Sequence, residues 1–397
     1  MSNLKSNHYL HALDNYKPKS NKDWQLHWLD DQPMLYSKSH DRLHLLNPVA
    51  GFIWTCCDGK TDVKTIRKAL QDIFVDSEVA EDLINILTLW RKQELIDFNV
   101  QLIDSNVRVA YLIIAHHQPS HLAKLINALN CEWAYFFIHI DKKANLEDFK
   151  KIVHLNENVI FLEDEQRIKI YWSGFNMVTA TLNLLGTAMN FGKHFHRYCL
   201  LSGSDFPIKN LEFIKKQFTI DREFIRIDRR LGSSDKNTHK HSVDYYHFMD
   251  TDNSSVDKIS KREEYNKITL YHGSQWWSLT EPCITYILEF LQKNPDYIDF
   301  HKYTFCPDEI FFHSIVKDSP FAINITHDFE TVSSVSNFLV SNEHGCHYID
   351  WNITGVSLPK VLDTNDINRL LNATTCFARK FDEKKSSELM NKILEII

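Results

Sequence analysis

Residues 107–115 read VRVAYLIIA, an almost unbroken apolar run. A strand whose two faces are both covered by other elements has this composition. A helix is predicted over residues 120–130, a second apolar strand over residues 134–140 and a shorter third one over residues 159–161. Strand, helix and strand in this order predict an α/β domain with a parallel sheet.

His116 and Asp141 directly follow the first two predicted strands. Ligands of open α/β sheets bind at the carboxyl ends of the strands, so both residues are candidates for a binding site. No glycine-rich phosphate loop follows either strand, which argues against a dinucleotide fingerprint and against a Walker A site. A bound nucleotide would therefore be held in another way.

Residues 305–316 read FCPDEIFFHSIV and predict a helix that begins at Pro307. Asp308 and Glu309 fall in its first turn, where backbone N–H groups favour an anion. An apolar face fixes this helix in the core: Ile310, Phe311, Phe312, Ile315 and Val316. Such a helix end is a rigid mount for a general base. The alternative is that the two acids only complement the helix dipole.

The 397 residues carry a net charge of −7, with 43% hydrophobic and 24% charged residues. These values are typical of a soluble globular protein and give no general attraction to nucleic acid or anionic membrane. No apolar run is long enough to cross a bilayer, and the N-terminus lacks the apolar segment of a signal peptide. The eight cysteines show no zinc-binding spacing, so we expect reduced thiols in a cytoplasmic protein.

Residues 1–100 predict a separate α+β domain, which a polar link joins to a second domain over residues 107–397. A hairpin is expected at residues 35–46, followed by a turn at Asn47-Pro48 and a small helix near residues 50–54. Thr61 is the expected N-cap of a second helix, and residues 77–92 form a third. The apolar faces of these two helices are predicted to consist of Val63, Ile66, Leu70 and Ile73, and of Val79, Leu83, Ile86 and Trp90.

Over residues 22–98 this first domain resembles the PqqD-like, winged-helix domains that recognise peptides in bacterial peptide-modifying systems. The resemblance rests on Leu45-Leu46-Asn47, Ala50, Trp54, Asp58-Gly59, Thr61, Ile66 and Leu95-Ile96. It implies recruitment of a peptide. A winged helix can also bind DNA, but acidic residues slightly outnumber basic ones here, which disfavours phosphate binding. A role in oligomerisation or stability stays open.

The second domain resembles, over residues 107–385, the glycosyltransferase family of core-2/I-branching N-acetylglucosaminyltransferases and peptide O-xylosyltransferases. Six motifs occur in the family's order: Ile138-His139-Ile140-Asp141-Lys142, Trp172-Ser173-Gly174, Ser204-Asp205-Phe206-Pro207-Ile208, Gly273-Ser274-Gln275-Trp276, Pro307-Asp308-Glu309 and Phe377-Ala378-Arg379-Lys380-Phe381. The last motif and Asp350-Trp351 favour the xylosyltransferase branch. The resemblance implies a GT-A-like fold, with a mixed, mostly parallel sheet and flanking helices, and inverting, metal-independent transfer from a UDP-sugar.

By this resemblance Glu309 is the general base, and Arg379 and Lys380 bind the diphosphate of the donor. Basic groups must stabilise a leaving diphosphate where no metal does so. From composition alone, two adjacent basic residues would be assigned to a solvated surface. The other implied contacts to the UDP-sugar are His116, Asp141, Trp172, Ser173, Asp350 and Trp351, and those to the acceptor or the sugar are Asp205, Gln275, Trp276 and Asp308.

Several of these residues have plainer interpretations. Asp141 would contact the uracil or the ribose, or else cap a turn at the end of its strand. Trp172 and Trp276 would be walls of the sugar site, or else parts of the core.

A metal site is the alternative for Asp250-Thr251-Asp252, which has the DxD form of many metal-dependent glycosyltransferases. This triplet lies in a polar stretch, residues 232–263, that we interpret as a mobile loop and a candidate lid. Because no apolar strand delivers the two acids, we expect no metal there. The histidines of the same stretch are expected to be solvated: His239, His241 and His247.

Gln275 departs from the family. The xylosyltransferases carry an acidic residue at this position, and the branching enzymes carry neither an acidic residue nor glutamine. The donor therefore stays open between UDP-xylose, UDP-N-acetylglucosamine and another UDP-sugar. We expect an enzyme that glycosylates a Ser or Thr hydroxyl of a peptide recruited by residues 1–100, without a cofactor and without a nucleic-acid partner. A glycan-branching enzyme and a catalytically idle binding protein are the alternatives.

Overall fold

The computed structural model describes residue 14, residues 16–39, 41–73, 107–154, 156–232, 240–252, 260–330, 342–351 and 359–397, and positions 83, 86–87, 89–91, 93 and 95–98. Contacts divide the chain into two units. The first comprises Met1–Ile103 with Ser319–Asn324, and the second comprises Asp104–Asp318 with Ile325–Ile397.

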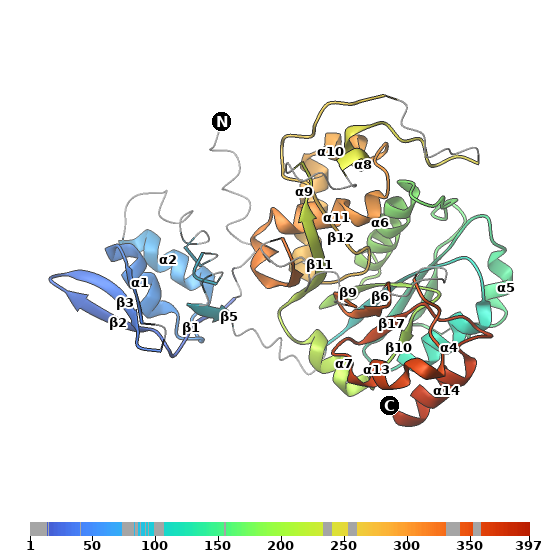
Figure 1. Ribbon diagram of the computed structural model, residues 1–397, viewed down its shortest axis with the longest axis horizontal. Helices are drawn as coiled ribbons and strands as arrows, with labels where there is room; N and C mark the ends of the chain where they lie inside the picture. Colours follow the sequence, from blue (N-terminus) through green and yellow to red (C-terminus); the bar gives the residue numbers. More distant parts are fainter. Residues whose placement is uncertain are drawn as a thin grey trace. The chain divides into compact units, whose positions relative to one another are not determined.

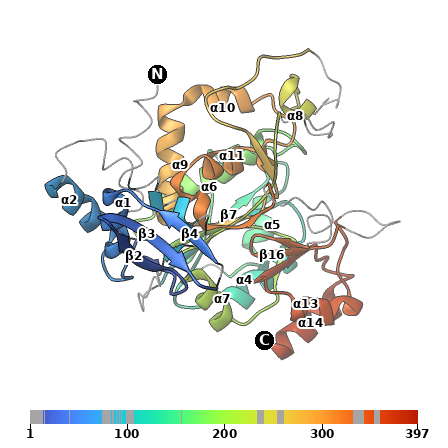
Figure 2. The same cartoon turned by 60° about the vertical axis from the view of Figure 1, so that its left-hand side comes forward.

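The first unit contains a three-stranded antiparallel sheet of β2 (Gln25–Leu29), β3 (Gln32–Ser37) and β4 (Arg42–Leu45), seen in blue in Figure 2. β1 (Pro18–Ser20) pairs separately with β5 (Ile96–Phe98). The predicted hairpin is thus confirmed as β3 and β4, and β2 was not predicted. Asn47 and Pro48 do not form a separate turn but start α1 (Pro48–Cys56), because the Asn47 side chain accepts the N–H of Ala50.

The next helix, α2 (Val63–Ile73), begins one residue later than the predicted N-cap implies. Asp62, and not Thr61, accepts the N–H of Thr65, while Thr61 binds Asp58. Val63, Ile66 and Leu70 are fully buried as predicted, but Ile73 is 55% exposed. The third predicted helix lies largely outside the described residues, Val79 included; its Leu83 and Trp90 are helical and buried.

The main sheet of the second unit has the strand order β12-β11-β13-β9-β6-β7-β8 (Figure 1). The predicted parallel sheet is confirmed for β8 (Val159–Phe161), β7 (Ala134–Ile140), β6 (Val109–Ala115) and β9 (Arg197–Ser202). Beyond β9 the sheet becomes antiparallel through β13 (Ser278–Thr280), β11 (Glu223–Arg230) and β12 (Tyr271–Gly273), and β14 (Ile325–Asp328) runs parallel to β11. Four of these seven pairings are parallel, so the prediction of a mixed, mostly parallel sheet is confirmed.

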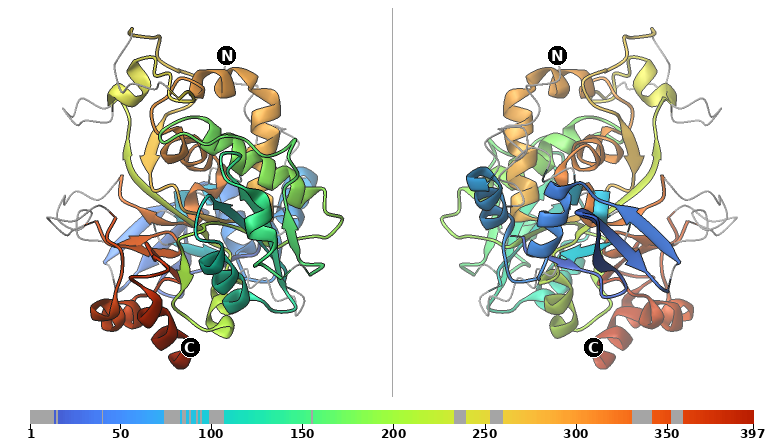
Figure 3. Two further views of the ribbon diagram at one scale, coloured as in Figure 1. Left: turned by 90° about the vertical axis from the view of Figure 1, so that its right-hand side faces the viewer. Right: turned by 90° about the vertical axis from the view of Figure 1, so that its left-hand side faces the viewer.

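Two helices cover the two faces of the parallel strands (α4 in teal and α6 in green in Figure 3). α4 (Pro119–Leu129) shares a core with alternate residues of β6, and α6 (Asn176–Met189) packs on β6 and β7. The other helices are α5 (Leu146–Lys150), α7 (Leu211–Phe218), α8 (Lys240–Asp244), α9 (Glu281–Lys293), α10 (Pro295–His301), α11 (Phe311–Lys317), α13 (Ile367–Asn372) and α14 (Ser387–Ile396). Among the described residues, no helix combines the length and the apolarity needed to cross a membrane.

A smaller sheet returns the C-terminal segment to the end of β9. Its strand order is β10 (Phe206–Pro207), β17 (Phe377–Arg379), β16 (His347–Ile349) and β15 (Glu343–His344). Phe206 pairs with Ala378, and the N–H of Phe381 donates to the carbonyl of Ser204. This pairing brings two motifs that are far apart in the sequence into contact.

Candidate functional site

The carboxyl ends of β7, β6 and β9 form one edge of the main sheet. Ala115 pairs in register with Ile140, and Ile114 pairs with Ser202. His116 and Asp141 therefore lie at neighbouring strand ends, as predicted from the sequence. Partial burial and the positive charges of Lys380 and Lys143 lower the pKa of His116, and Asp141 opposes this effect. Lys380 therefore belongs to the same neighbourhood as His116.

Asp141 fits its plainer interpretation, because its Oδ1 accepts the N–H of Lys143 at 2.9 Å and so caps the turn. The buried Arg167 also stabilises this turn, because it donates to the carbonyls of Ile140 at 2.8 Å and Ala144 at 2.9 Å. Asp141 Oδ2 lies 3.6 Å from Lys143 Nζ. Asp141 is thus a rigid part of the sheet edge.

Arg379 lies at the same edge with its guanidinium stacked on Trp276, 4.0 Å from the ring centre. Its Nε is 3.7 Å from Oδ1 of Asp205, a carboxylate with no exposed surface. Asp205 also accepts from the N–H and the hydroxyl of Ser202 and pairs with His347 Nε2 at 3.2 Å. The Asp205 carboxylate is enclosed by these partners, and its predicted contact with the acceptor or the sugar stays a prediction. In this structure Asp205 positions Arg379, and the buried Trp276 supports it.

Asp350 and Trp351 follow β16, where Ile349 pairs with Arg379. The Asp350 carboxylate is buried and accepts from Arg369 Nη1 on α13 at 3.2 Å. The Trp351 side chain is 46% exposed. Asp350 and Trp351 thus lie beside Arg379 and Lys380, the residues predicted to bind the diphosphate. The Asp350 carboxylate is already bound by Arg369 of α13.

The Trp172-Ser173-Gly174 turn is joined to the segment that precedes Glu309. Ser173 and Cys306 both adopt left-handed backbone conformations, with φ of 65° and 51°. The N–H of Cys306 donates to the Ser173 carbonyl at 3.1 Å, and the Cys306 thiol donates to the Ser173 hydroxyl at 3.1 Å. Such conformations cost about 1–3 kcal/mol each and persist only where the surroundings enforce them. Trp172 is not part of the core, since it is 73% exposed and contacts Phe305 edge-to-face.

The two acids of the DxD triplet anchor this turn. Both oxygens of Asp250 lie within 3.2 Å of the N–H of Asn176, at the start of α6. A Cβ on Gly174 would lie 2.1 Å from Asp250 Oδ1, so only glycine allows this approach. Asp252 accepts from the Tyr171 hydroxyl at 2.8 Å. Within the described part of the chain, no group of three or more His, Cys, Asp or Glu side chains is arranged to hold a metal ion.

The polar stretch around these acids is not a free loop over residues 240–252. It contains α8, and His247, which was expected to be solvated, is 2% exposed against Phe305. Residues 260–263 of the predicted lid are also described, and Arg262 among them is buried. Residues 233–239 and 253–259 lie outside the described residues, as do His239 and the side chain of His241.

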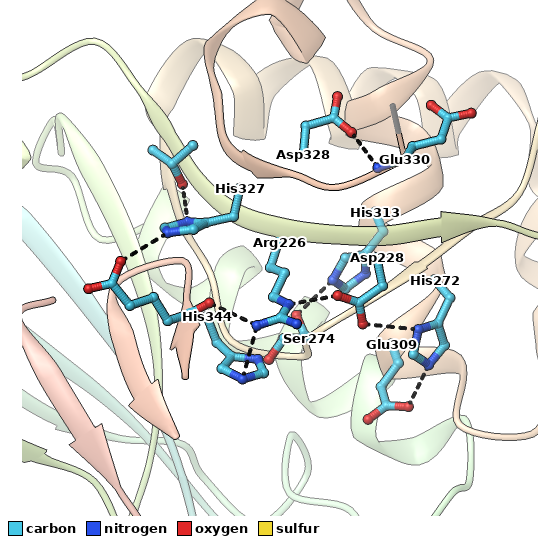
Figure 4. A network of polar contacts seen from close by, with 12 residues as sticks. Arg226, Asp228, His272, Ser274, Glu309, His313, His327, Asp328, Glu330 and His344 are labelled. Atoms are coloured by element: carbon cyan, nitrogen blue, oxygen red, sulfur yellow. Dashed lines mark hydrogen bonds and ion pairs between the residues drawn. The ribbon is translucent and has the colours of Figure 1, made fainter. Parts of the chain in front are cut away.

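Glu309 ends a single 3₁₀ turn, η2 (Pro307–Glu309), and not the first turn of a longer α-helix. Ile310, with φ −129° and ψ −42°, separates this turn from α11, which is buried on every side. Burial and the charge of Glu309 raise the pKa of Asp308 to about 7. The Glu309 side chain is 34% exposed, and its Oε2 lies 3.2 Å from His272 Nε2 (Figure 4).

Sequence reasoning missed the residues behind Glu309. His272 Nδ1 lies 3.4 Å from Asp228 Oδ2, and Asp228 Oδ1 accepts from Arg226 Nε at 2.6 Å. Burial alone lowers the pKa of His272, but the two carboxylates outweigh it and raise this pKa to about 9. The alternation of Arg226 and Asp228 on one face of β11 was the available signal. Gln275 is half-buried, and its side-chain Nε2 is enclosed without a partner among the described residues.

Comparison with known proteins identifies the class to which this fold and site belong, the glycosyltransferases. Residues 109–371 match the family model described as Core-2/I-Branching enzyme. The chain belongs to the core-2/I-branching enzyme family. Residues 34–96 match the model described as Coenzyme PQQ synthesis protein D (PqqD).

Curated relatives come from both branches of this family. Xylosyltransferase 2 of Mus musculus is 25% identical over 297 residues, which cover 72% of this chain and 33% of the relative. A β-1,3-galactosyl-O-glycosyl-glycoprotein β-1,6-N-acetylglucosaminyltransferase of Bos taurus is 24% identical over 291 residues, covering 69% of this chain and 66% of the relative. The chain thus spans about a third of the length of the xylosyltransferase.

The hydrogen bonds of Asp250 to the N–H of Asn176 give a prediction that distinguishes a structural role of this carboxylate from a role as a metal ligand. Asparagine at a helix start accepts the same N–H, so Asp250→Asn should keep nearly full activity and stability. Asp250→Ala removes the acceptor and should lower the free energy of unfolding by about 0.5–2 kcal/mol. Urea denaturation and transfer assays check both. A folded Asn variant that is as inactive as the Ala variant and recovers with Mn²⁺ would identify Asp250 as a metal ligand.

Proposed function

We propose that this protein is an inverting, metal-independent transferase that moves a sugar from a UDP-sugar to a Ser or Thr hydroxyl of a peptide or protein. The observation that carries the proposal is the partly exposed Glu309 carboxylate, held through one oxygen by His272 on an anchored turn. A base for an acceptor hydroxyl needs this combination of access and fixed orientation.

The chemistry is a single displacement. Glu309 removes the proton of the acceptor hydroxyl while its oxygen bonds to the anomeric carbon, and the bond from that carbon to the UDP oxygen breaks on the opposite side. Negative charge then develops on the diphosphate, where Arg379 and Lys380 stabilise it. Arg379 suits this role because Asp205 and Trp276 fix its guanidinium before any ligand binds.

The donor is a UDP-sugar of the kind that either branch of the family uses, UDP-xylose or UDP-N-acetylglucosamine. The relatives' printed names, xylosyltransferase and N-acetylglucosaminyltransferase, support this pair. The enclosed amide nitrogen of Gln275 offers a hydrogen-bond donor to a sugar hydroxyl or carbonyl. A glycan-branching activity is the second candidate, favoured by the bovine relative, 66% of whose own length is covered, against 33% of the murine xylosyltransferase.

The acceptor is a peptide recruited by the first unit, which matches the PqqD family. The sheet β2-β3-β4 has two edges, and an extended peptide can add to such an edge as a further strand. Tyr36 pairs with Leu43, and Met34 pairs with Leu45, on the face opposite the buried Leu35. Leu43 and Leu45 are 52% and 67% exposed on β4, so apolar contacts are available beside the β4 edge.

The role of Glu309 is tested by Glu309→Gln, which removes the proton acceptor at nearly constant shape. Turnover should fall by about 10²–10⁴-fold, the usual contribution of a positioned base. UDP affinity, measured by calorimetry, should change little. Equal losses of turnover and affinity would mean that Glu309 is structural, and near-normal turnover would favour Asp308 as the base.

The diphosphate site is tested at Lys380, since removal of Arg379 would also take one of its partners from the buried Asp205. Lys380→Ala should weaken UDP binding about tenfold or more, because hydrogen bonds to charged groups contribute about 1.5–3 kcal/mol. The exposed Lys384 provides a matched control, and Lys384→Ala should bind UDP normally.

Transfer should also survive EDTA. Loss of activity on chelation, with recovery in Mn²⁺, would contradict the proposal of a metal-independent enzyme.

Recruitment by the first unit is tested by charge at the β4 edge. Leu43→Asp with Leu45→Asp should raise KM for the native peptide and leave kcat and UDP-sugar hydrolysis unchanged, because only capture of the acceptor is affected. Ile73→Asp, which adds a charge at another exposed apolar position of the same unit, serves as the control. An unchanged KM in the folded double variant would argue for a glycan acceptor or for another binding surface.

A further inference from the structure

We propose that His272 and Asp228 form a positioning pair for the general base: Asp228 orients His272, and His272 holds one oxygen of Glu309 so that the other faces the acceptor. This inference rests on the proposed role of Glu309. The three side chains come from three elements, since Asp228 belongs to β11, His272 to β12 and Glu309 to η2.

The three interior side chains of this series are nearly enclosed, and only the last one, Glu309, is accessible. The Arg226 side chain is 5% exposed, those of His272 and Asp228 are 9% and 12% exposed, and that of Glu309 is 34% exposed. A fixed interior group at one end and an accessible carboxylate at the other is the arrangement expected of a supported base. Figure 4 shows the series ending at Glu309.

Arg226 anchors the interior end and cannot turn toward Glu309. Besides Asp228, it donates to the carbonyl of Glu343 at 3.0 Å and lies 3.3 Å from His344 Nε2. Its guanidinium also stacks on Phe329 at 4.9 Å from the ring centre. Asp228 is therefore held by a side chain that contacts of several kinds keep in place.

The backbone of β12 approaches that of β11 closely at Gly273, the residue after His272. The register between these strands shifts between Ile227 and Arg229, which leaves Asp228 at the irregularity. Such irregularities re-aim side chains, here that of Asp228 toward His272. A Cβ on Gly273 would lie 1.8 Å from the Arg226 carbonyl oxygen and 2.6 Å from a ring carbon of His313. Glycine at this position is thus a requirement of the pair.

The imidazole can serve both carboxylates only when both of its nitrogens carry a proton. Asp228 and Glu309 together favour that cationic form, and burial opposes it. The charged or titratable groups that face His272 are Arg226, Asp228 and the paired Arg229 on β11, Glu309 and Asp308 on η2, and His313 on α11. His313 does not compete as a cation, because burial lowers its pKa to about 4.

The sign of the pH dependence follows from this form. The folded-state pKa of His272 is raised to about 9, so the doubly protonated imidazole is present below that pH and is lost above it. Above pH 9 one of the two contacts loses its donor, and Glu309 is no longer held. We therefore expect kcat to fall as the pH rises through about 9, with little change in KM for the donor.

The test compares the pH profiles of kcat for the native enzyme and for Asp228→Asn. Removing the charge of Asp228 should move the alkaline limb to lower pH by about 1–3 units, the usual effect of one opposite charge at this distance. His272→Gln keeps a donor toward Glu309 but cannot titrate, so its alkaline limb should disappear, and His272→Ala should lower kcat about 10- to 100-fold. UDP binding should stay normal in all three. Asp328→Asn, on the neighbouring β14, is the matched control and should keep the native profile.

A profile of Asp228→Asn that coincides with the native one after scaling would overturn the positioning role. This outcome is separable from failure of the proposed function, because Glu309→Gln would still abolish transfer. Should Asp228→Asn fail to fold, NMR of the native enzyme decides: the His272 imidazole nitrogens, assigned by their loss in His272→Gln, should stay doubly protonated up to about pH 9. A neutral His272 at pH 7 would equally overturn the proposal.

Discussion

The fully buried carboxylate of Asp205 determines how the second unit closes. Removing an ionised group from water costs several kcal/mol unless protein partners replace the water. Ser202 supplies two donors from the same strand end, and His347 and Arg379 supply opposite charge from β16 and β17. Because His347 is 142 residues further along the chain, the small sheet must return to the end of β9, and it carries Lys380 to the edge where His116 lies.

The two halves of the site are built in the same way. Arg379 is supported by Asp205, which His347 supports in turn, and Glu309 is supported by His272 and then by Asp228. In each case charge alternates in sign from the interior toward the surface. Alternation leaves no buried charge unpaired and fixes the outermost group before a ligand arrives, which is how a protein stabilises developing charge at low cost.

The local sequence pattern was sufficient to predict those elements of the fold that are determined by residues close together in the sequence. The runs at residues 107–115 and 134–140 are apolar because both faces are covered. The second strand was therefore predicted with its bounds, and the first with its end but with a start two residues too early. Glu309 and Arg379 came from family motifs. The partners of these residues could not be predicted, because Asp228 meets His272 only through the pairing of β11 with β12. The same holds for Asp250, whose partner Asn176 is 74 residues away.

The contact between Gly174 and Asp250 makes the residue tolerated at position 174 depend on the residue at position 250. Any side chain at position 174 would meet the carboxylate, so a lineage that changes the glycine must first shorten residue 250 or displace the segment that carries it. Either intermediate loses the acceptor at the start of α6. A larger residue at position 174 should therefore appear only together with a change at position 250, whereas asparagine at position 250 is compatible with the glycine. Covariation of this one-sided kind would record the constraint.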